Sequence, residues 1–174
     1  MSFSADIDHS IAMQGFADKI YKSVLPIKEI TRFTRNDNQV NILDKEFHID
    51  CVLHLENGQI MTLQEKFLRG KYANFDCFTL EYFNNQSTNE FGEWHRLCTD
   101  LYFTGYGEPE TGFVSAYLFK TLEIKLALLK DELKGTLKKT TTSNANFYAY
   151  PFSQFKDEWF VYKKPYAKGN LNNV

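Results

Sequence analysis

The segment from His48 to Phe67, HIDCVLHLENGQIMTLQEKF, carries the strongest structural pattern of the chain. Apolar and polar residues alternate on both sides of Glu56-Asn57-Gly58, which is typical of two half-buried strands joined by a turn. Two turns fit these residues. A two-residue Asn57-Gly58 turn would pair Asp50 with Glu65, whereas a three-residue loop with a left-handed Gly58 would pair Asp50 with Gln64.

The alternation of apolar residues favours the three-residue loop. A slip of one residue would send every side chain to the opposite face, and only this register sets apolar against apolar. It places Lys66 across from His48 and points Glu65 toward the apolar side, where its carboxylate needs a sheet edge or a cation as partner. The apolar face then consists of Ile49, Cys51, Leu53, Leu55, Met61, Leu63 and Phe67.

Composition indicates one folded domain. The chain has 174 residues, of which 43% are hydrophobic and 16% aromatic, enough for a real core. We expect a single domain over residues 1–163 and a flexible, basic and Asn-rich tail over residues 164–174. The net charge of −2 predicts no overall positive field, so nucleic-acid binding would need a local basic surface and metal ions.

The three cysteines, Cys51, Cys77 and Cys98, are odd in number, lie in apolar patterns and form no C-x-x-C pair. Reduced core thiols in a cytoplasmic protein are the expectation. We find no signal peptide and no apolar run long enough to span a membrane, so no membrane association is expected. Neither a phosphate-binding loop, a G-x-S-x-G elbow nor a dinucleotide fingerprint appears, which argues against nucleotide hydrolysis, acyl transfer and hydride transfer.

The remaining periodicity predicts an α/β (α+β) fold with a central mixed sheet flanked by helices. Gly105-Tyr106-Gly107-Glu108-Pro109 is expected to break the chain and residues 136–144 to form a polar loop. The predicted helices cover residues 5–23, 93–102 and 122–133. Besides the hairpin, strands are predicted over residues 29–33, 39–43, 78–83, 113–119 and 158–162.

This order resembles the core of the P-D-(D/E)-x-K nuclease superfamily, a restriction-endonuclease-like core of helix, three meandering strands, helix and strand. The family places an acid on the second core strand and D/E-x-K on the third. Asp50 matches the first acid, and Gln64-Glu65-Lys66 matches the second element with glutamine in the acidic position. The segments TLEYFNN (79–85) and GEWHRLCTDLYFTGY (92–106) are similar to phage-encoded members.

The resemblance implies a metal-dependent nuclease that hydrolyses phosphodiester bonds in DNA with Mg²⁺ or Mn²⁺, encoded by a phage or mobile element. Phosphodiester hydrolysis needs a metal-bound water and charge neutralisation at phosphorus. The implied catalytic residues are Asp50, Gln64, Lys66 and Glu81, with Asp50, Glu81 and the Glu65 carbonyl as metal ligands. Lys66 would orient the water or stabilise the phosphate.

A basic segment follows the third strand, and Arg69, Lys71 and Tyr72 are predicted to contact DNA phosphates there; a solvated loop is the alternative. The resemblance also allows a homodimer. A second hypothesis stays open: an inactive nuclease-fold protein that serves as a DNA- or protein-binding module. Gln64 and the acidic net charge favour this alternative, whereas the grouping of Asp50, Lys66 and Glu81 favours the enzyme.

Overall fold

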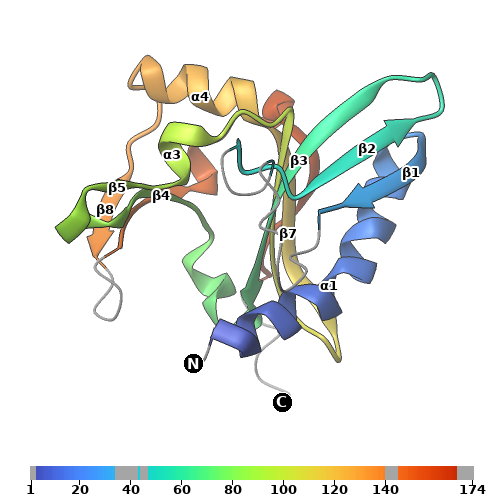
Figure 1. Ribbon diagram of the computed structural model, residues 1–174, viewed down its shortest axis with the longest axis horizontal. Helices are drawn as coiled ribbons and strands as arrows, with labels where there is room; N and C mark the ends of the chain where they lie inside the picture. Colours follow the sequence, from blue (N-terminus) through green and yellow to red (C-terminus); the bar gives the residue numbers. More distant parts are fainter. Residues whose placement is uncertain (1–2, 34–42, 44–46, 140–144, 168–174) are drawn as a thin grey trace.

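The computed structural model describes residues 3–33, 43, 47–139 and 145–167. The fold contains two β-sheets (Figure 1). The larger sheet has the order β1-β2-β3-β6-β7-β10, and only its β3–β6 pair is parallel. The smaller sheet has the order β5-β4-β9-β8 and is antiparallel throughout. The fold is therefore mixed, with a central mixed sheet as predicted.

The elements of the larger sheet and the helix that covers it come from both halves of the chain. Helix α1 packs on one face of this sheet through Met13, Ala17 and Tyr21, which are fully buried and lie four residues apart on one face. The bounds are α1 (Phe3–Val24), β1 (Ile27–Arg32), β2 (Cys51–Leu55), β3 (Ile60–Arg69), β6 (Leu101–Glu108), β7 (Gly112–Lys120) and β10 (Phe160–Lys164).

The smaller sheet packs against the other face of the larger one, on the side away from α1 (Figure 1). Phe78 and Tyr150 of the smaller sheet meet Tyr102 and Phe119 of the larger sheet in an aromatic core between the two. The remaining elements are η1 (Gly70–Phe75), β4 (Cys77–Asn85), η2 (Gln86–Thr88), β5 (Glu90–Phe91), α3 (Glu93–Arg96), α4 (Thr121–Leu129), β8 (Thr136–Lys139), β9 (Asn146–Pro151), η3 (Phe152–Gln154) and η4 (Asp157–Trp159).

Several predicted elements change in the structure. The predicted helix over residues 93–102 ends at Arg96, and the predicted break at residues 105–109 lies mostly in the buried strand β6. A Cβ on Gly105 would stand 2.4 Å from the Phe113 ring, so this glycine serves close strand packing rather than a turn. Part of the predicted polar loop forms β8, and β9 was not predicted.

The predicted strand at residues 39–43 falls almost wholly outside the described residues, as does the tail from residue 168. Lys164, assigned to the flexible tail, is the last residue of β10. All three cysteines are free, but only Cys51 is buried, and Cys98 is exposed, so the expectation of three core thiols is wrong for Cys98. Among the described residues, no helix is long and apolar enough to cross a membrane.

Candidate functional site

The hairpin has the predicted register. Cys51 pairs with Leu63 and Leu53 with Met61, and Gly58 has the left-handed φ of +83° that the three-residue loop requires. Strand β2 starts at Cys51 and His48 has a φ of 51°, so the ladder does not reach the predicted His48–Lys66 pair. Asp50 therefore lies just before β2, where its Oδ2 accepts a 2.7 Å hydrogen bond from the Glu65 amide.

Glu65 points to the face of β3 that meets α1. Its carboxylate is paired with a cation, which is one of the two partners predicted for it. The Arg32 guanidinium donates to both carboxylate oxygens at 2.9 and 2.8 Å, and the Tyr21 hydroxyl donates at 2.8 Å. The Glu65 carboxylate thus stabilises the fold and does not face the predicted site. In a strand the N–H and C=O of one residue point the same way, so the Glu65 carbonyl faces the Asp50 side of β3.

Lys66 points to the opposite face, between the two sheets. Its Nζ lies 3.5 Å from Oε2 of Glu93 and donates a 3.3 Å hydrogen bond to the Thr79 carbonyl. Burial favours the neutral amine, but the carboxylates of Glu93 and Glu81 outweigh it and raise the pKa of Lys66. The side chain is only 22% exposed, so a charged lysine is held here at neutral pH.

Tyr102 is a buried tyrosine whose hydroxyl is under the electrostatic influence of three carboxylates. It is fully buried and is the partner of Gln64 in the parallel β3–β6 ladder. Burial raises the pKa of its hydroxyl, and the carboxylates of Glu93, Asp50 and Glu81 raise it further. All three carboxylates therefore act on one buried hydroxyl, although they come from the start of β2, from β4 and from α3.

Gln64 Oε1 is buried with no hydrogen-bond partner among the described residues, and Glu93 Oε1 and the Tyr102 hydroxyl have none there except each other. A buried oxygen without a partner is costly, and native proteins satisfy most such atoms with protein, water or an ion. We call Asp50, Gln64, Lys66, Glu81, Glu93 and Tyr102 the polar cluster.

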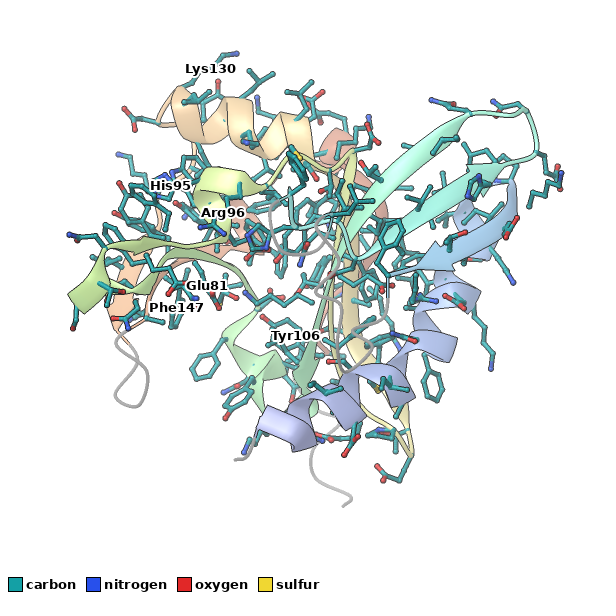
Figure 2. The ribbon with its side chains drawn as sticks, viewed as in Figure 1. Glu81, His95, Arg96, Tyr106, Lys130 and Phe147 are labelled. Carbon is teal, nitrogen blue, oxygen red and sulfur yellow. The ribbon has the colours of Figure 1, made fainter. Side chains whose placement is uncertain are left out.

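The structure places the Glu81 carboxylate where it acts on Lys66, Gln64 opposite Tyr102 in the β3–β6 ladder, and Asp50 where it acts on Tyr102. It corrects the predicted location. The cluster lies between the two sheets, beside the central strand β3, and not at a sheet edge. Glu81 belongs to the smaller sheet and pairs with Phe147, and its side chain points to the face of β4 opposite to Phe78 and Leu80 (Figure 2).

Glu93 and Tyr102 were not predicted as site residues. Helix α3 approaches β4 closely because Gly92 has no Cβ; one there would stand 2.6 Å from the Glu81 carbonyl oxygen. The Gly92 amide donates to the Tyr82 carbonyl at 3.0 Å. In the sequence, the glycine that precedes Glu93 is the feature that could have indicated a close contact there. The position of Glu93, however, depends on a contact between α3 and β4 that no local pattern encodes.

The three predicted DNA-contacting residues differ in their availability. Arg69 Nη1 lies 2.8 Å from His9 Nδ1 and 3.5 Å from the Glu108 carboxylate, so its charge is used inside the fold. Lys71 Nζ lies 5.1 Å above the Tyr72 ring, and Tyr72 stacks on the exposed Phe75. Lys71 and Tyr72 thus form an exposed basic and aromatic surface on η1.

Among the described residues, no three His, Cys, Asp or Glu side chains are grouped closely enough to hold a metal ion by themselves. The chain matches no protein-family model, no curated protein and no solved structure. The polar cluster and the strand order around it are the features of the molecule that bear on function.

Proposed function

We propose that this chain is a metal-dependent deoxyribonuclease of the P-D-(D/E)-x-K type. The observation that carries the proposal is a charged, largely buried lysine, Lys66, held by Glu93 and Glu81 on the same strand as Gln64, whose buried Oε1 has no partner among the described residues. Buried oxygens near a charge destabilise the fold unless a water, an ion or a ligand satisfies them, and a bound metal ion is one such partner.

The strand order supports the same proposal. Helix α1 is followed by the meander β1-β2-β3, and β6 then joins β3 in parallel. The resemblance implies helix, three meandering strands, helix and strand; here the four-residue α3 precedes β6, Asp50 lies just before the second strand, and Lys66 lies on the third. Strands β4 and β5 and helix α3, inserted between β3 and β6, bring Glu81 and Glu93 to Lys66.

The oxygens of the cluster fit Mg²⁺ or Mn²⁺ better than a metal that needs a full protein cage. Mg²⁺ takes oxygen ligands, keeps several waters and commonly binds through one or two carboxylates. Asp50, Glu93 and Gln64 Oε1 would hold the ion together with waters, and Glu81 would keep Lys66 charged. Bound there, the ion would supply an activated water and neutralise charge on the phosphate.

The side chains of the cluster then have distinct roles. Lys66 remains protonated because its pKa is raised, so its ammonium can stabilise the negative charge that develops on phosphorus. The Tyr102 hydroxyl remains neutral because burial raises its pKa, so it can donate a hydrogen bond to a phosphate oxygen or to a water. Neither group is suited to remove a proton at neutral pH, which leaves that task to a carboxylate.

A second function, binding of DNA or protein without cleavage, has one observation in its favour. Lys71 and Tyr72 form an exposed surface, whereas Arg69, the other cation among the predicted DNA contacts, is paired inside the fold. Lys71 and Tyr72 would then supply a binding surface without chemistry at the polar cluster.

The test is incubation of the purified chain with linear, nicked and branched DNA, with Mg²⁺, Mn²⁺ or a chelator. The proposal expects cleavage of at least one substrate with metal and none with the chelator. Folded protein that cleaves none of them under any condition contradicts the enzyme. Gel-shift binding of the same DNA without cleavage would then support the binding module.

A further inference from the structure

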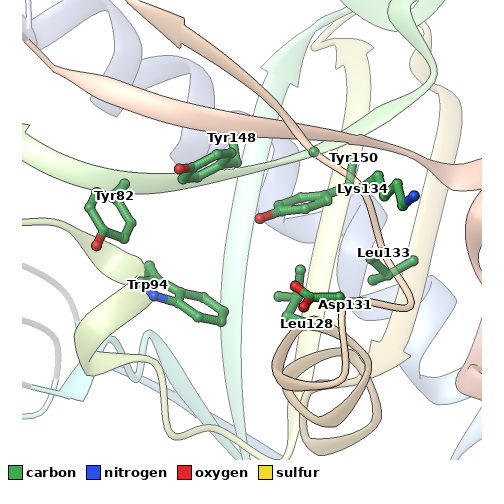
Figure 3. Close-up of a pocket in the computed structure, with 9 residues that line it drawn as sticks. Tyr82, Trp94, Leu128, Asp131, Leu133, Lys134, Tyr148 and Tyr150 are labelled. Atoms are coloured by element: carbon green, nitrogen blue, oxygen red, sulfur yellow. The ribbon is translucent and has the colours of Figure 1, made fainter.

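A pocket of about 610 Å³ opens between the smaller sheet and helices α3 and α4, and the polar cluster does not use it. Its aromatic wall consists of Tyr82, Tyr148 and Tyr150, and Trp94 lies across from them (Figure 3). Leu128 and Leu133 complete the apolar lining, and Asp131 lies on the side of Trp94 (Figure 3). Trp94 is half-buried; it packs against the core between the sheets and also lines this pocket.

The aromatic side chains that line the pocket continue the core between the sheets, where Tyr150 is buried and Tyr148 and Trp94 pack against it. Tyr82 and Tyr148 meet at 89° with their ring centroids 5.6 Å apart, and Tyr148 and Tyr150 are inclined by 30° at 6.0 Å. Among the described residues, no hydrogen bond engages the hydroxyl of Tyr82, Tyr148 or Tyr150. The pocket therefore offers flat aromatic faces together with hydroxyl groups that can donate or accept.

We propose that this pocket receives an unpaired nucleobase of single-stranded DNA, an inference that rests on the proposed nuclease function. Bases stack on aromatic side chains without regard to sequence, and hydroxyl and carboxylate groups can hydrogen-bond their edges. A small organic cation would be the other ligand of an aromatic cage. The lining charges of Asp131 and Lys134 cancel, however, so the pocket has no excess negative charge to attract one.

The pocket is joined to the polar cluster through two pairs of adjacent residues. On β4, the carboxylate of Glu81 acts on Lys66 while its neighbour Tyr82 lines the pocket. Adjacent residues of a strand point to opposite faces, so the two sites lie on either side of β4. On α3, Glu93 contacts Lys66 while Trp94 lines the pocket. A base bound in the pocket would thus hold α3 and β4, the elements that carry both carboxylates near Lys66.

The test uses the full chain in chelator, where no cleavage occurs, so that it does not depend on nuclease activity. Trp94 reports on the pocket, because the other tryptophan, Trp159, is buried. We expect a single-stranded oligonucleotide to quench tryptophan fluorescence, and a blunt duplex of equal length to quench it much less. Trp94→Phe should remove the quenching.

Affinity measured by fluorescence anisotropy of a labelled oligonucleotide supplies an independent readout. Tyr148→Leu should weaken single-strand binding about tenfold, because a stacking partner is lost. Tyr162→Leu, a half-buried tyrosine of β10, is the matched control and should leave the affinity unchanged.

Equal affinity of Tyr148→Leu and the parent chain, or the absence of quenching, would overturn the inference even if the protein cleaves DNA. Quenching by tetramethylammonium but not by the oligonucleotide would also overturn it, in favour of a cation cage. Strand binding that depends on Tyr148 in a protein that never cleaves DNA would support the pocket and reject the nuclease.

Discussion

Lys66 is the residue on which the proposed chemistry depends. It lies between Glu93 and Glu81, and its raised pKa keeps it charged throughout the neutral range. A surface lysine would carry the same charge but would be screened by solvent, whereas the limited exposure of Lys66 strengthens its interaction with a bound anion. The buried position therefore makes Lys66 suitable for transition-state stabilisation as well as for binding.

Lys66→Met should lower the rate of DNA cleavage by about 100-fold or more, because it removes a preorganised charge from the phosphate. DNA affinity should change little, since one cation among several phosphate contacts contributes a small share. Lys130→Met, at an exposed lysine, is the matched control and should retain full activity. Cleavage kinetics, gel shifts and circular dichroism melts would separate these effects. Full activity of Lys66→Met would exclude its assigned role.

Arg32 of β1 and Glu65 of β3 form an ion pair on the face of the larger sheet that meets α1, opposite to Lys66. This pair stabilises the fold. The Glu65 side chain is only 4% exposed and depends on Arg32 for charge compensation. We expect Arg32→Met to lower the free energy of unfolding by about 3 kcal/mol, because it leaves a buried carboxylate unpaired.

The matched control for Arg32 is Lys163→Met, which breaks the more exposed pair with Asp157 and should cost less than about 1 kcal/mol. Urea denaturation of both variants measures the difference. Equal losses would mean that the Arg32–Glu65 pair contributes no more than a surface ion pair.

Among the elements, the β2–β3 hairpin was predictable because its register depends on local information. The alternation of apolar residues and the turn around Gly58 fixed the pairing, and the need of Glu65 for a cation followed from it. Strand β6 was not predictable in the same way. Its two glycines resemble a turn in sequence, but they allow close approach to Phe113 and Gly112 of β7.

The site was predictable in part for the same reason. Gln64 and Lys66 lie on the hairpin and were placed correctly relative to each other. Strand β4 belongs to the smaller sheet and pairs with β9, which lies far along the chain. Helix α3 packs on β4, and this contact places Glu93 beside Lys66. Strand pairing between distant segments leaves no local pattern, so neither β9 nor the role of Glu93 could be inferred from nearby residues.

Two glycines provide a test of these elements. Gly105→Ala should destabilise the protein by about 2 kcal/mol, since its Cβ would overlap the Phe113 ring. Gly15→Ala is the matched control, because it lies in the exposed interior of α1 with no atom within 4 Å of its Cβ. This second change should stabilise the protein by about 0.5–1 kcal/mol through helix propensity. Thermal melts would report both, and a stabilising Gly105→Ala would contradict the assigned packing of β6.

At the scale of the whole molecule, the two sheets and α1 enclose several tyrosines whose hydroxyls cannot readily ionise. Burial, with a smaller contribution from Tyr148, raises the pKa of Tyr150 to about 12. Burial also raises the pKa of Tyr21, Tyr102 and Tyr106. In the unfolded chain these groups ionise near their ordinary pKa of about 10.

The free energy of unfolding should therefore fall as pH rises above about 10. In that range the unfolded chain releases tyrosine protons that the folded chain keeps, so deprotonation favours unfolding. Below pH 10 both states hold these protons and the contribution is fully present. Urea denaturation at pH 8, 10 and 11 would measure the trend, and Tyr21→Phe should make it shallower. A free energy that is constant from pH 8 to 11 would contradict the burial of these hydroxyls.

The central claim is that the polar cluster between the two sheets is a metal centre. The most direct measurement is an anomalous difference map from a crystal of the full chain soaked in Mn²⁺. The account predicts a peak within about 2.5 Å of oxygens from Asp50, Glu93 and Gln64. It also predicts that the peak weakens or disappears in Asp50→Asn. A map in which Mn²⁺ binds only elsewhere, or not at all while the cluster stays intact, would contradict the account.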